Sequence, residues 1–163
     1  MEISLEGVLI VNVEIRTFRD NELITGISIL AVLKHSKELE YSKCILIEPI
    51  LSYSRVLKAL RRANSCIKSI EDLILRENIA FADFDSRFQD CLILSLNSLL
   101  LFREMGLISL NDGKAFYLGE KFDFYNSGLG EKANERISVA KRLSEIMMKG
   151  DASDLYLSLR IEL

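Results

Sequence analysis

The sequence predicts a mostly helical α+β fold: one helical domain that also carries a small β-hairpin. Three observations lead to this prediction. Only one of the 163 residues is proline and eight are glycine, so few residues interrupt helices. Several long segments carry apolar residues at helical spacing. Near residue 112, two short apolar runs flank the turn sequence Asn-Asp-Gly, which favours a hairpin.

The N-terminal part of the chain is expected to contain a strand followed by a helix. Residues 3–18 are rich in β-branched side chains and partly alternate between apolar and polar, as in a strand. Asp20 or Asn21 is then expected to cap a helix over 22–37, where apolar residues recur at helical spacing. Gly26 either weakens this helix or lets a neighbouring element approach it closely.

Three further signals divide the next segment. The single proline, Pro49, predicts a break near Glu48, because the ring forces the preceding residue out of the α region. Residues 54–64 have the pattern of an amphipathic helix. Ser69 precedes Asp72 by three positions, a loose capping box that predicts the start of another short helix.

The longest predicted helix covers residues 84–105 and ends at Gly106, a residue suited to the left-handed position after a helix. Two predicted strands, 107–110 and 115–118, follow on either side of the Asn-Asp-Gly turn. Helix, strand, tight turn and strand together form the C-terminal part of a winged-helix unit. The C-terminal half, 81–163, is therefore expected to be winged-helix-like.

The sequence after the hairpin gives no sign of a second domain. A helix is expected over 131–149, ended by Gly150, and the last thirteen residues form either a short helix or a strand. Neither a linker nor a repeat divides the sequence. We therefore expect a single domain, 1–163, whose helical half reaches to about residue 80.

Composition and charge narrow the classes of function. The net charge is −3 and the pI is about 5.3, whereas DNA-reading domains are usually basic. The three cysteines have no metal-binding spacing and are expected to be buried free thiols in a reducing cytoplasm. No signal peptide is recognisable, and the apolar runs are too short to span a bilayer. We expect a cytoplasmic protein with no membrane contact.

A row of basic residues is the first candidate binding surface. Arg55, Lys58 and Arg62 stand at positions i, i+3 and i+7 of the predicted helix over 54–64, and Arg61 flanks them. The commonest explanation for such a row is a solvated helix face. The functional alternative is a docking stripe for an acidic partner or for a nucleic-acid backbone.

The hairpin and the helix before it form the second candidate surface. That helix has two basic residues, Arg87 and Arg103, balanced by Asp90 and Glu104, so it offers little attraction for phosphates. It is also apolar nearly all round, so a core or a partner must cover it. The expected partner-binding residues of the hairpin are Asp112, Lys114, Phe116 and Tyr117.

No pattern points to catalytic, cofactor-binding or metal-binding residues. The segment "GLGEKA", 128–133, matches a dinucleotide-binding motif, but too little chain follows it for a βαβ unit, and a helix-entry loop explains it better. His35 has lysines rather than a carboxylate beside it in the sequence. A non-enzymatic protein is expected, although the many acidic residues leave a carboxylate-based enzyme open.

The order of segments resembles a known family. The similarity lies in an N-terminal helix, a compact apolar segment, a long helix with a hairpin, a further helix and an apolar tail. These segments read "ELITGISILAVLKHSK", "CILIEPILSYSRVLKAL", "SIEDLILRENIAFADFDSRFQDCLILSLNSLLLFREMGLISLNDGKAFYL", "LGEKANERISVAKRLSEIM" and "DLYLSLRI". Together they resemble the middle component of bacterial three-component ABC systems, which include Lamassu-type antiviral defence systems.

The resemblance implies a non-catalytic accessory subunit that bridges an SMC- or Rad50-like ABC ATPase and an effector, often a nuclease. It carries no catalytic residue over to this chain. Protein–protein interaction is then the main activity, with DNA contacted indirectly or through Arg55, Lys58, Arg61 and Arg62. The alternative that the residues leave open is a winged-helix transcriptional regulator that binds DNA.

Overall fold

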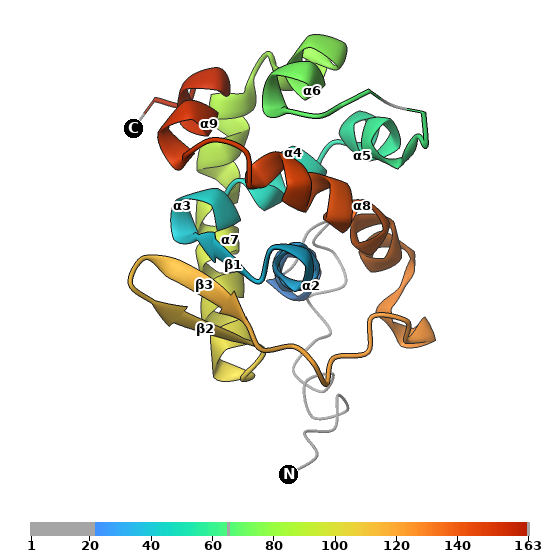
Figure 1. The fold of residues 1–163 in the computed structure, drawn as a ribbon, viewed down its shortest axis with the longest axis vertical. Helices are drawn as coiled ribbons and strands as arrows, with labels where there is room; N and C mark the ends of the chain where they lie inside the picture. Colours follow the sequence, from blue (N-terminus) through green and yellow to red (C-terminus); the bar gives the residue numbers. More distant parts are fainter. Residues whose placement is uncertain (1–21, 65, 163) are drawn as a thin grey trace.

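The computed structural model describes residues 22–64 and 66–162. In this part of the chain most residues are helical, and a small antiparallel sheet of three strands lies at one side (Figure 1). The predicted mostly helical α+β class is confirmed to that extent, whereas a winged-helix unit is not confirmed. The strand expected within 3–18 and the caps expected at Asp20 or Asn21 lie outside the described residues.

The elements follow one another in an order that mixes long and very short helices. The helices are α2 (Glu22–Ser36), α3 (Tyr41–Cys44), α4 (Ile47–Leu51), α5 (Ser54–Arg61), α6 (Ile70–Arg76), α7 (Phe84–Glu104), α8 (Glu131–Met147) and α9 (Ala152–Ser158). Short 3₁₀ turns occur at Asn78–Phe81 and Ser127–Leu129. The strands are β1 (Glu38–Glu40), β2 (Ile108–Asn111) and β3 (Lys114–Tyr117).

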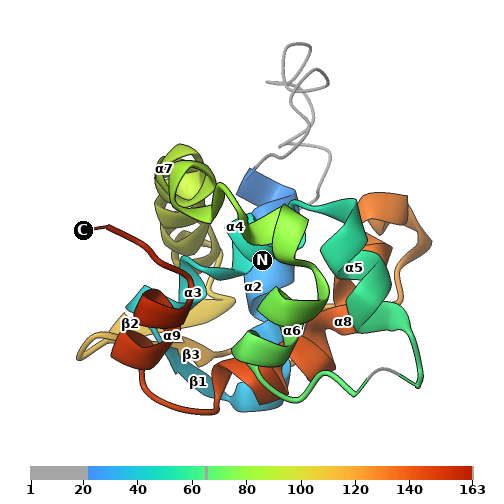
Figure 2. The same cartoon turned by 90° about the horizontal axis from the view of Figure 1, so that it is seen from above.

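Helix α2 is the centre of the core. Every residue from 25 to 33 is buried, because α2 contacts α4, α7, α8 and β3 (Figures 1 and 2). Gly26 permits the closest of these contacts: a Cβ atom there would lie 2.0 Å from the ring of Phe102 on α7. The expected close approach at Gly26 is confirmed, and the absence of a side chain is what allows the two helices to meet.

The predicted hairpin is confirmed. Strands β2 and β3 are joined by Asp112 and Gly113, whose φ angles of 48° and 77° are those of a tight two-residue hairpin turn. Strand β1 was not predicted, and it pairs with β3, giving the order β1–β3–β2. Its three residues include a single buried apolar side chain, Leu39, which is too short a pattern for alternation to be recognised.

The end of α7 follows the prediction closely. Gly106 has φ = 71°, and its N–H donates to the carbonyl of Arg103. The N–H of Leu107 donates to the carbonyl of Phe102, which satisfies another carbonyl at the end of the helix. This turn directs the chain from α7 straight into β2, so the hairpin is held next to the long helix.

The break expected near Glu48 is wrong. Glu48 and Pro49 both lie within α4, and the helical chain is interrupted before it, around Leu46. Pro49 occupies the first turn of α4, where a backbone N–H would have no acceptor within the helix, so the missing donor costs nothing there. The proline therefore helps to begin a helix rather than to end one.

A buried ion pair joins three of the core helices. Arg136 of α8 donates to both carboxylate oxygens of Glu48 on α4, and its Nη2 lies 3.0 Å from Oε1. Thr25 of α2 donates to Glu48 Oε2 at 2.8 Å. Both charged side chains are almost completely buried, at 3% and 0% exposed. Two charges can be buried in this way only where each of them has several hydrogen-bonding partners.

Within the described residues, none of the helices is both long and apolar enough to cross a lipid bilayer.

Candidate interaction surfaces

The basic residues of α5 lie on its exposed side. Val56, Ala59 and Leu60 are buried, and the predicted basic side chains face outward. Arg55 forms an ion pair with Glu77 at 3.3 Å, and Arg61 forms one with Glu135 at 3.2 Å. These acidic neighbours cancel part of the charge that the sequence pattern suggested. Lys58 is exposed and forms no ion pair with the part of the chain that the structure describes.

The predicted row of four basic residues reaches the C-terminal end of α5. Helix α5 ends at Arg61, and Arg62 has an extended conformation, with φ = −63° and ψ = 120°. Arg142 of α8 holds this end, because its Nη1 donates to the carbonyls of Leu60 at 2.8 Å and Arg62 at 2.7 Å. Arg62 is exposed at the C-cap of α5, and its φ is still helical, so its own ψ redirects only the chain that follows it; its alignment with Arg55 and Lys58 stays a prediction.

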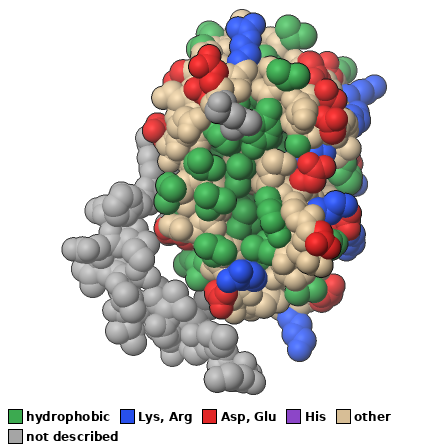
Figure 3. Space-filling view, turned by 90° about the vertical axis from the view of Figure 1, so that its left-hand side faces the viewer, with side chains coloured by type: hydrophobic (Ala, Val, Ile, Leu, Met, Phe, Trp, Pro, Cys, Tyr) green, Lys and Arg blue, Asp and Glu red, His purple; other side chains and the backbone are tan. Residues whose placement is uncertain are grey.

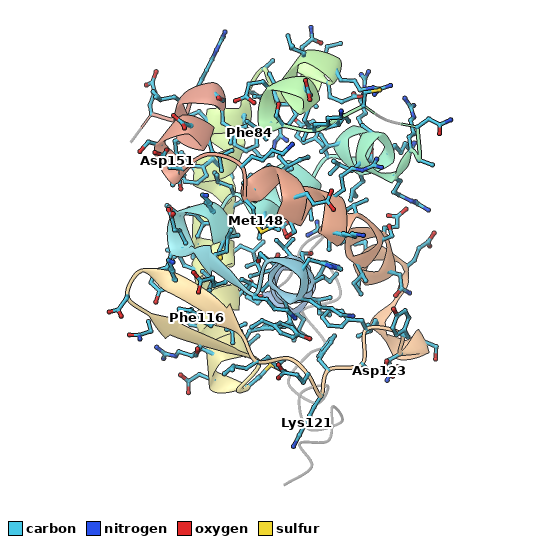
Figure 4. The ribbon with its side chains drawn as sticks, viewed as in Figure 1. Phe84, Phe116, Lys121, Asp123, Met148 and Asp151 are labelled. Carbon is cyan, nitrogen blue, oxygen red and sulfur yellow. The ribbon has the colours of Figure 1, made fainter. Side chains whose placement is uncertain are left out.

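The predicted hairpin residues divide between two faces of the sheet. Asp112 is exposed in the turn, and Lys114 forms an ion pair with Glu38 of β1 at 2.6 Å. The hydrogen bond and charge of Glu38 raise the pKa of Lys114. Phe116, labelled on β3 in Figure 4, is partly exposed on the same face as Lys114, since alternate strand residues share a face.

Tyr117 lies on the opposite face of β3. Its hydroxyl donates to the carbonyl of Gly119 at 2.8 Å, and burial, with the charge of Glu120, raises its pKa. Lys37 Nζ lies 5.3 Å from the centre of its ring. The hairpin therefore offers Asp112, Lys114 and Phe116 to a partner together, whereas Tyr117 is engaged within the fold.

An apolar face of α7 remains uncovered. Ile93, Leu96 and Leu100 are 66%, 41% and 46% exposed, and their spacing of three and four residues places them along one side of the helix. Figure 3 shows a hydrophobic area largely free of charged side chains on the side of the molecule where α7 and the sheet lie. The apolar composition of this helix was noticed in the sequence, but periodicity could not tell which residues the core would leave exposed.

A second group of exposed apolar residues lies at the end of the molecule formed by α6 and α9 (Figure 1). Leu75 on α6, Ile79 in the following turn and Leu157 on α9 are all largely exposed. The two helices are in contact, and Ser158 donates to Glu71 at 2.8 Å. These residues were not predicted from the sequence. The available signal was that α6 has consecutive apolar residues at 73, 74 and 75, more than one narrow face requires.

The residues considered for chemistry are dispersed. No group of three or more His, Cys, Asp or Glu side chains that could hold a metal ion occurs in the ranges 22–64 and 66–162. Partial burial and the charge of Lys34 lower the pKa of His35. In "GLGEKA" a 3₁₀ turn leads into α8 through Gly130, whose φ is 86°, so the predicted helix-entry loop is confirmed.

The cysteines differ in exposure. Cys44 is buried, and burial raises the pKa of its thiol to about 12. Cys91 is partly buried, but Cys66 is exposed, so the expectation of three buried thiols is wrong. Cys66 follows the end of α5 in an irregular segment, where no periodic pattern could indicate burial.

No known protein family model matches this sequence, and no similar curated protein or solved structure was found.

Proposed function

We propose that this chain is a non-catalytic, cytoplasmic subunit that bridges an SMC- or Rad50-like ABC ATPase and an effector in prokaryotic antiviral or anti-plasmid defence. The observation that carries the proposal is the presence of exposed apolar side chains in two places, on α7 and at the α6–α9 end. Contiguous exposed apolar surface often marks a protein contact. Two such surfaces suit a subunit that holds two other proteins. The identity of those proteins comes from the resemblance in segment order.

The finer part of the proposal is that α7 and the hairpin form a winged-helix-like unit directed toward protein. Its support is the succession of a long helix and a hairpin whose second strand also pairs with β1. In a DNA reader the helix before the hairpin presents polar and basic side chains to the groove. Here its outer side carries Ile93, Leu96 and Leu100, which neutralise no phosphates.

The test is co-expression of the tagged chain with the products of its neighbouring genes, an SMC- or Rad50-like ATPase among them. We expect the ATPase to co-purify with the chain. The double variant Leu75→Glu/Leu157→Glu places charges in the α6–α9 surface. Because burying an unpaired charge is costly, it should reduce the recovery of one of the co-expressed proteins with the tagged chain at least about tenfold. Lys121→Glu is the control, because Lys121 lies on the loop after the hairpin and points away from the body (Figure 4).

A chain that is encoded beside no such ATPase, or that never binds one, would contradict the proposal. The same purified chain also tests the alternative, a winged-helix transcriptional regulator, which the exposed Lys58 and Arg62 favour. That alternative requires salt-sensitive binding to duplex DNA that is lost in Lys58→Glu/Arg62→Glu. Such binding, in the absence of any ATPase contact, would replace the first proposal with the second.

A further inference from the structure

We propose that the C-terminal end of α2 carries a binding site for single-stranded nucleic acid, in which lysines contact the phosphates and Tyr125 stacks on a base. The lysines are Lys34, Lys37 and Lys141. This proposal goes beyond the proposed function and does not rest on it. It assigns a ligand to side chains outside both the basic row of α5 and the exposed apolar surfaces.

The three lysines surround the end of α2. Lys34 is in its last turn, Lys37 follows it, and Lys141 lies on α8, which packs beside α2. Partial burial lowers the pKa of His35, and the positive charges of these lysines lower it further, whereas Glu145 raises it. Because the influence of a charge falls with distance, all three lysines lie near His35. Within the part of the chain that the structure describes, none of the three forms an ion pair, so their charges remain available to an anionic ligand.

The backbone at Lys37 has a conformation that lysine adopts only at a cost. Its φ angle is 69°, in the left-handed region, and its N–H donates to the carbonyl of Leu33 at 2.7 Å. A left-handed residue at a helix end is usually glycine, because a side chain destabilises this conformation. Gly106 after α7 and Gly150 after α8 follow that rule, with φ = 71° at both. A lysine in this place therefore favours a role outside folding.

Tyr125 supplies an exposed aromatic ring beside these charges. It is 89% exposed, and Lys34 Nζ lies 5.7 Å from the centre of its ring and 4.6 Å from that of Phe124. The N–H of Tyr125 donates to the carboxylate of Asp123 at 2.9 Å, which helps to fix the loop that passes below α2 in Figures 1 and 4. A ring open to solvent next to a lysine provides a platform on which a base can stack.

The combination of lysines and a ring favours a single strand over other anionic ligands. Proteins that bind single strands without reading their sequence combine a positively charged surface with aromatic rings, because every unpaired base has a face to stack on. In a duplex the bases stack on one another, so the ring of Tyr125 would gain no such contact. An acidic peptide would use the lysines but would leave the ring exposed.

The test is the fluorescence anisotropy of a labelled oligothymidine of about twelve nucleotides, mixed with the purified full chain at about 20 mM salt. We expect a dissociation constant of about 100 µM or tighter, and a slope of log affinity against log salt of about −2 for three lysines. Lys37→Gly removes one charge together with the unfavourable backbone conformation. It should weaken binding about tenfold without lowering the midpoint of thermal unfolding.

Two further variants separate charge from stacking. Lys141→Gln should also weaken binding about tenfold, whereas Arg76→Gln, an equal change of charge at the exposed end of α6, is the control and should have no effect. Tyr125→Ala should weaken binding about tenfold, and Tyr125→Phe, which keeps the ring, should bind as the unaltered chain does.

No binding at this low salt would overturn the proposal, as would binding that Lys37→Gly, Lys141→Gln and Tyr125→Ala all leave unchanged. Binding of a duplex or of polyglutamate that is as tight as that of the oligothymidine would overturn it too, because the ring would then have no part in recognition. None of these results bears on co-purification with the ATPase, which is the measure of the proposed function.

Discussion

At the scale of single residues, the Glu48–Arg136 pair most clearly links chemistry to stability. Each charge is satisfied by the other and by a hydroxyl group of α2, because Thr25 donates to Glu48 and Arg136 donates to Ser28. Removal of one partner leaves a buried charge without its counterion. Replacement of both by apolar side chains of similar size leaves no charge to desolvate.

The buried pair predicts that a single substitution destabilises the protein more than a double one. Arg136→Met should lower the free energy of unfolding by about 3–5 kcal/mol, because Glu48 stays buried without its counterion. Glu48→Leu/Arg136→Met should recover most of this loss. Urea unfolding of the three proteins, followed by circular dichroism, gives the free energies. Equal losses in the single and the double variant would show that packing, rather than an orphaned charge, dominates at this site.

The sequence contained both of these residues but no signal that they meet. They are 88 positions apart, and a glutamate before a proline and an arginine within a helix are ordinary surface patterns. Their burial follows from α4 and α8 both packing against α2. Local periodicity describes one element at a time, so it cannot indicate which polar residues two distant elements enclose.

At the scale of elements, the segment after α5 shows how one helix supports another. Arg142 of α8 donates to two carbonyls at the end of α5, and Lys149 Nζ donates to the carbonyl of Lys68 at 2.6 Å. The terminal carbonyls of a helix have no partner within it, so Arg142 supplies a donor that α5 itself lacks. Arg142 of α8 thereby holds the chain at Arg62, and Lys149, which follows α8, holds it at Lys68.

We predict that Arg142→Ala loosens this segment without unfolding the domain. The loss of hydrogen bonds from a charged donor should make local opening easier by about 1.5–3 kcal/mol. Hydrogen–deuterium exchange of peptides covering 60–68 should therefore become faster, while exchange in α2 stays slow. Lys141→Ala is the control, because Lys141 is the exposed neighbour of Arg142. Unchanged exchange in Arg142→Ala would mean that the other contacts of the segment suffice.

Elements with strong local signals were predictable, and those that depend on neighbours were not. Helix α7, the hairpin and the Ser69 cap were predicted, and Ser69 accepts from the N–H of Asp72 at 3.2 Å. Strand β1 exists only because β3 offers it a pairing edge. The end of α5 was predicted at 64 but occurs at Arg61, since α8 captures the carbonyls that a longer helix would have used.

At the scale of the whole molecule, the two predicted halves share one core. Helix α2 belongs to the first half and packs against α7, α8 and β3 of the second, while β1 joins the sheet of the hairpin. We therefore predict that the chain unfolds as one cooperative unit. Thermal unfolding followed by far-ultraviolet circular dichroism and by tyrosine absorbance should give the same midpoint. Two separated transitions would mean that the halves, divided near residue 80, fold independently.

The sequence by itself determined where the long helix and the hairpin occur, because helical spacing, a glycine after a helix and an Asn-Asp-Gly turn act within a few residues. Only the tertiary structure decided which side of α7 is left exposed, that α5 ends at Arg61 and that Glu48 meets Arg136. The physical reason is that burial and charge pairing are properties of surfaces in contact. Those surfaces come together only after the elements have packed around α2.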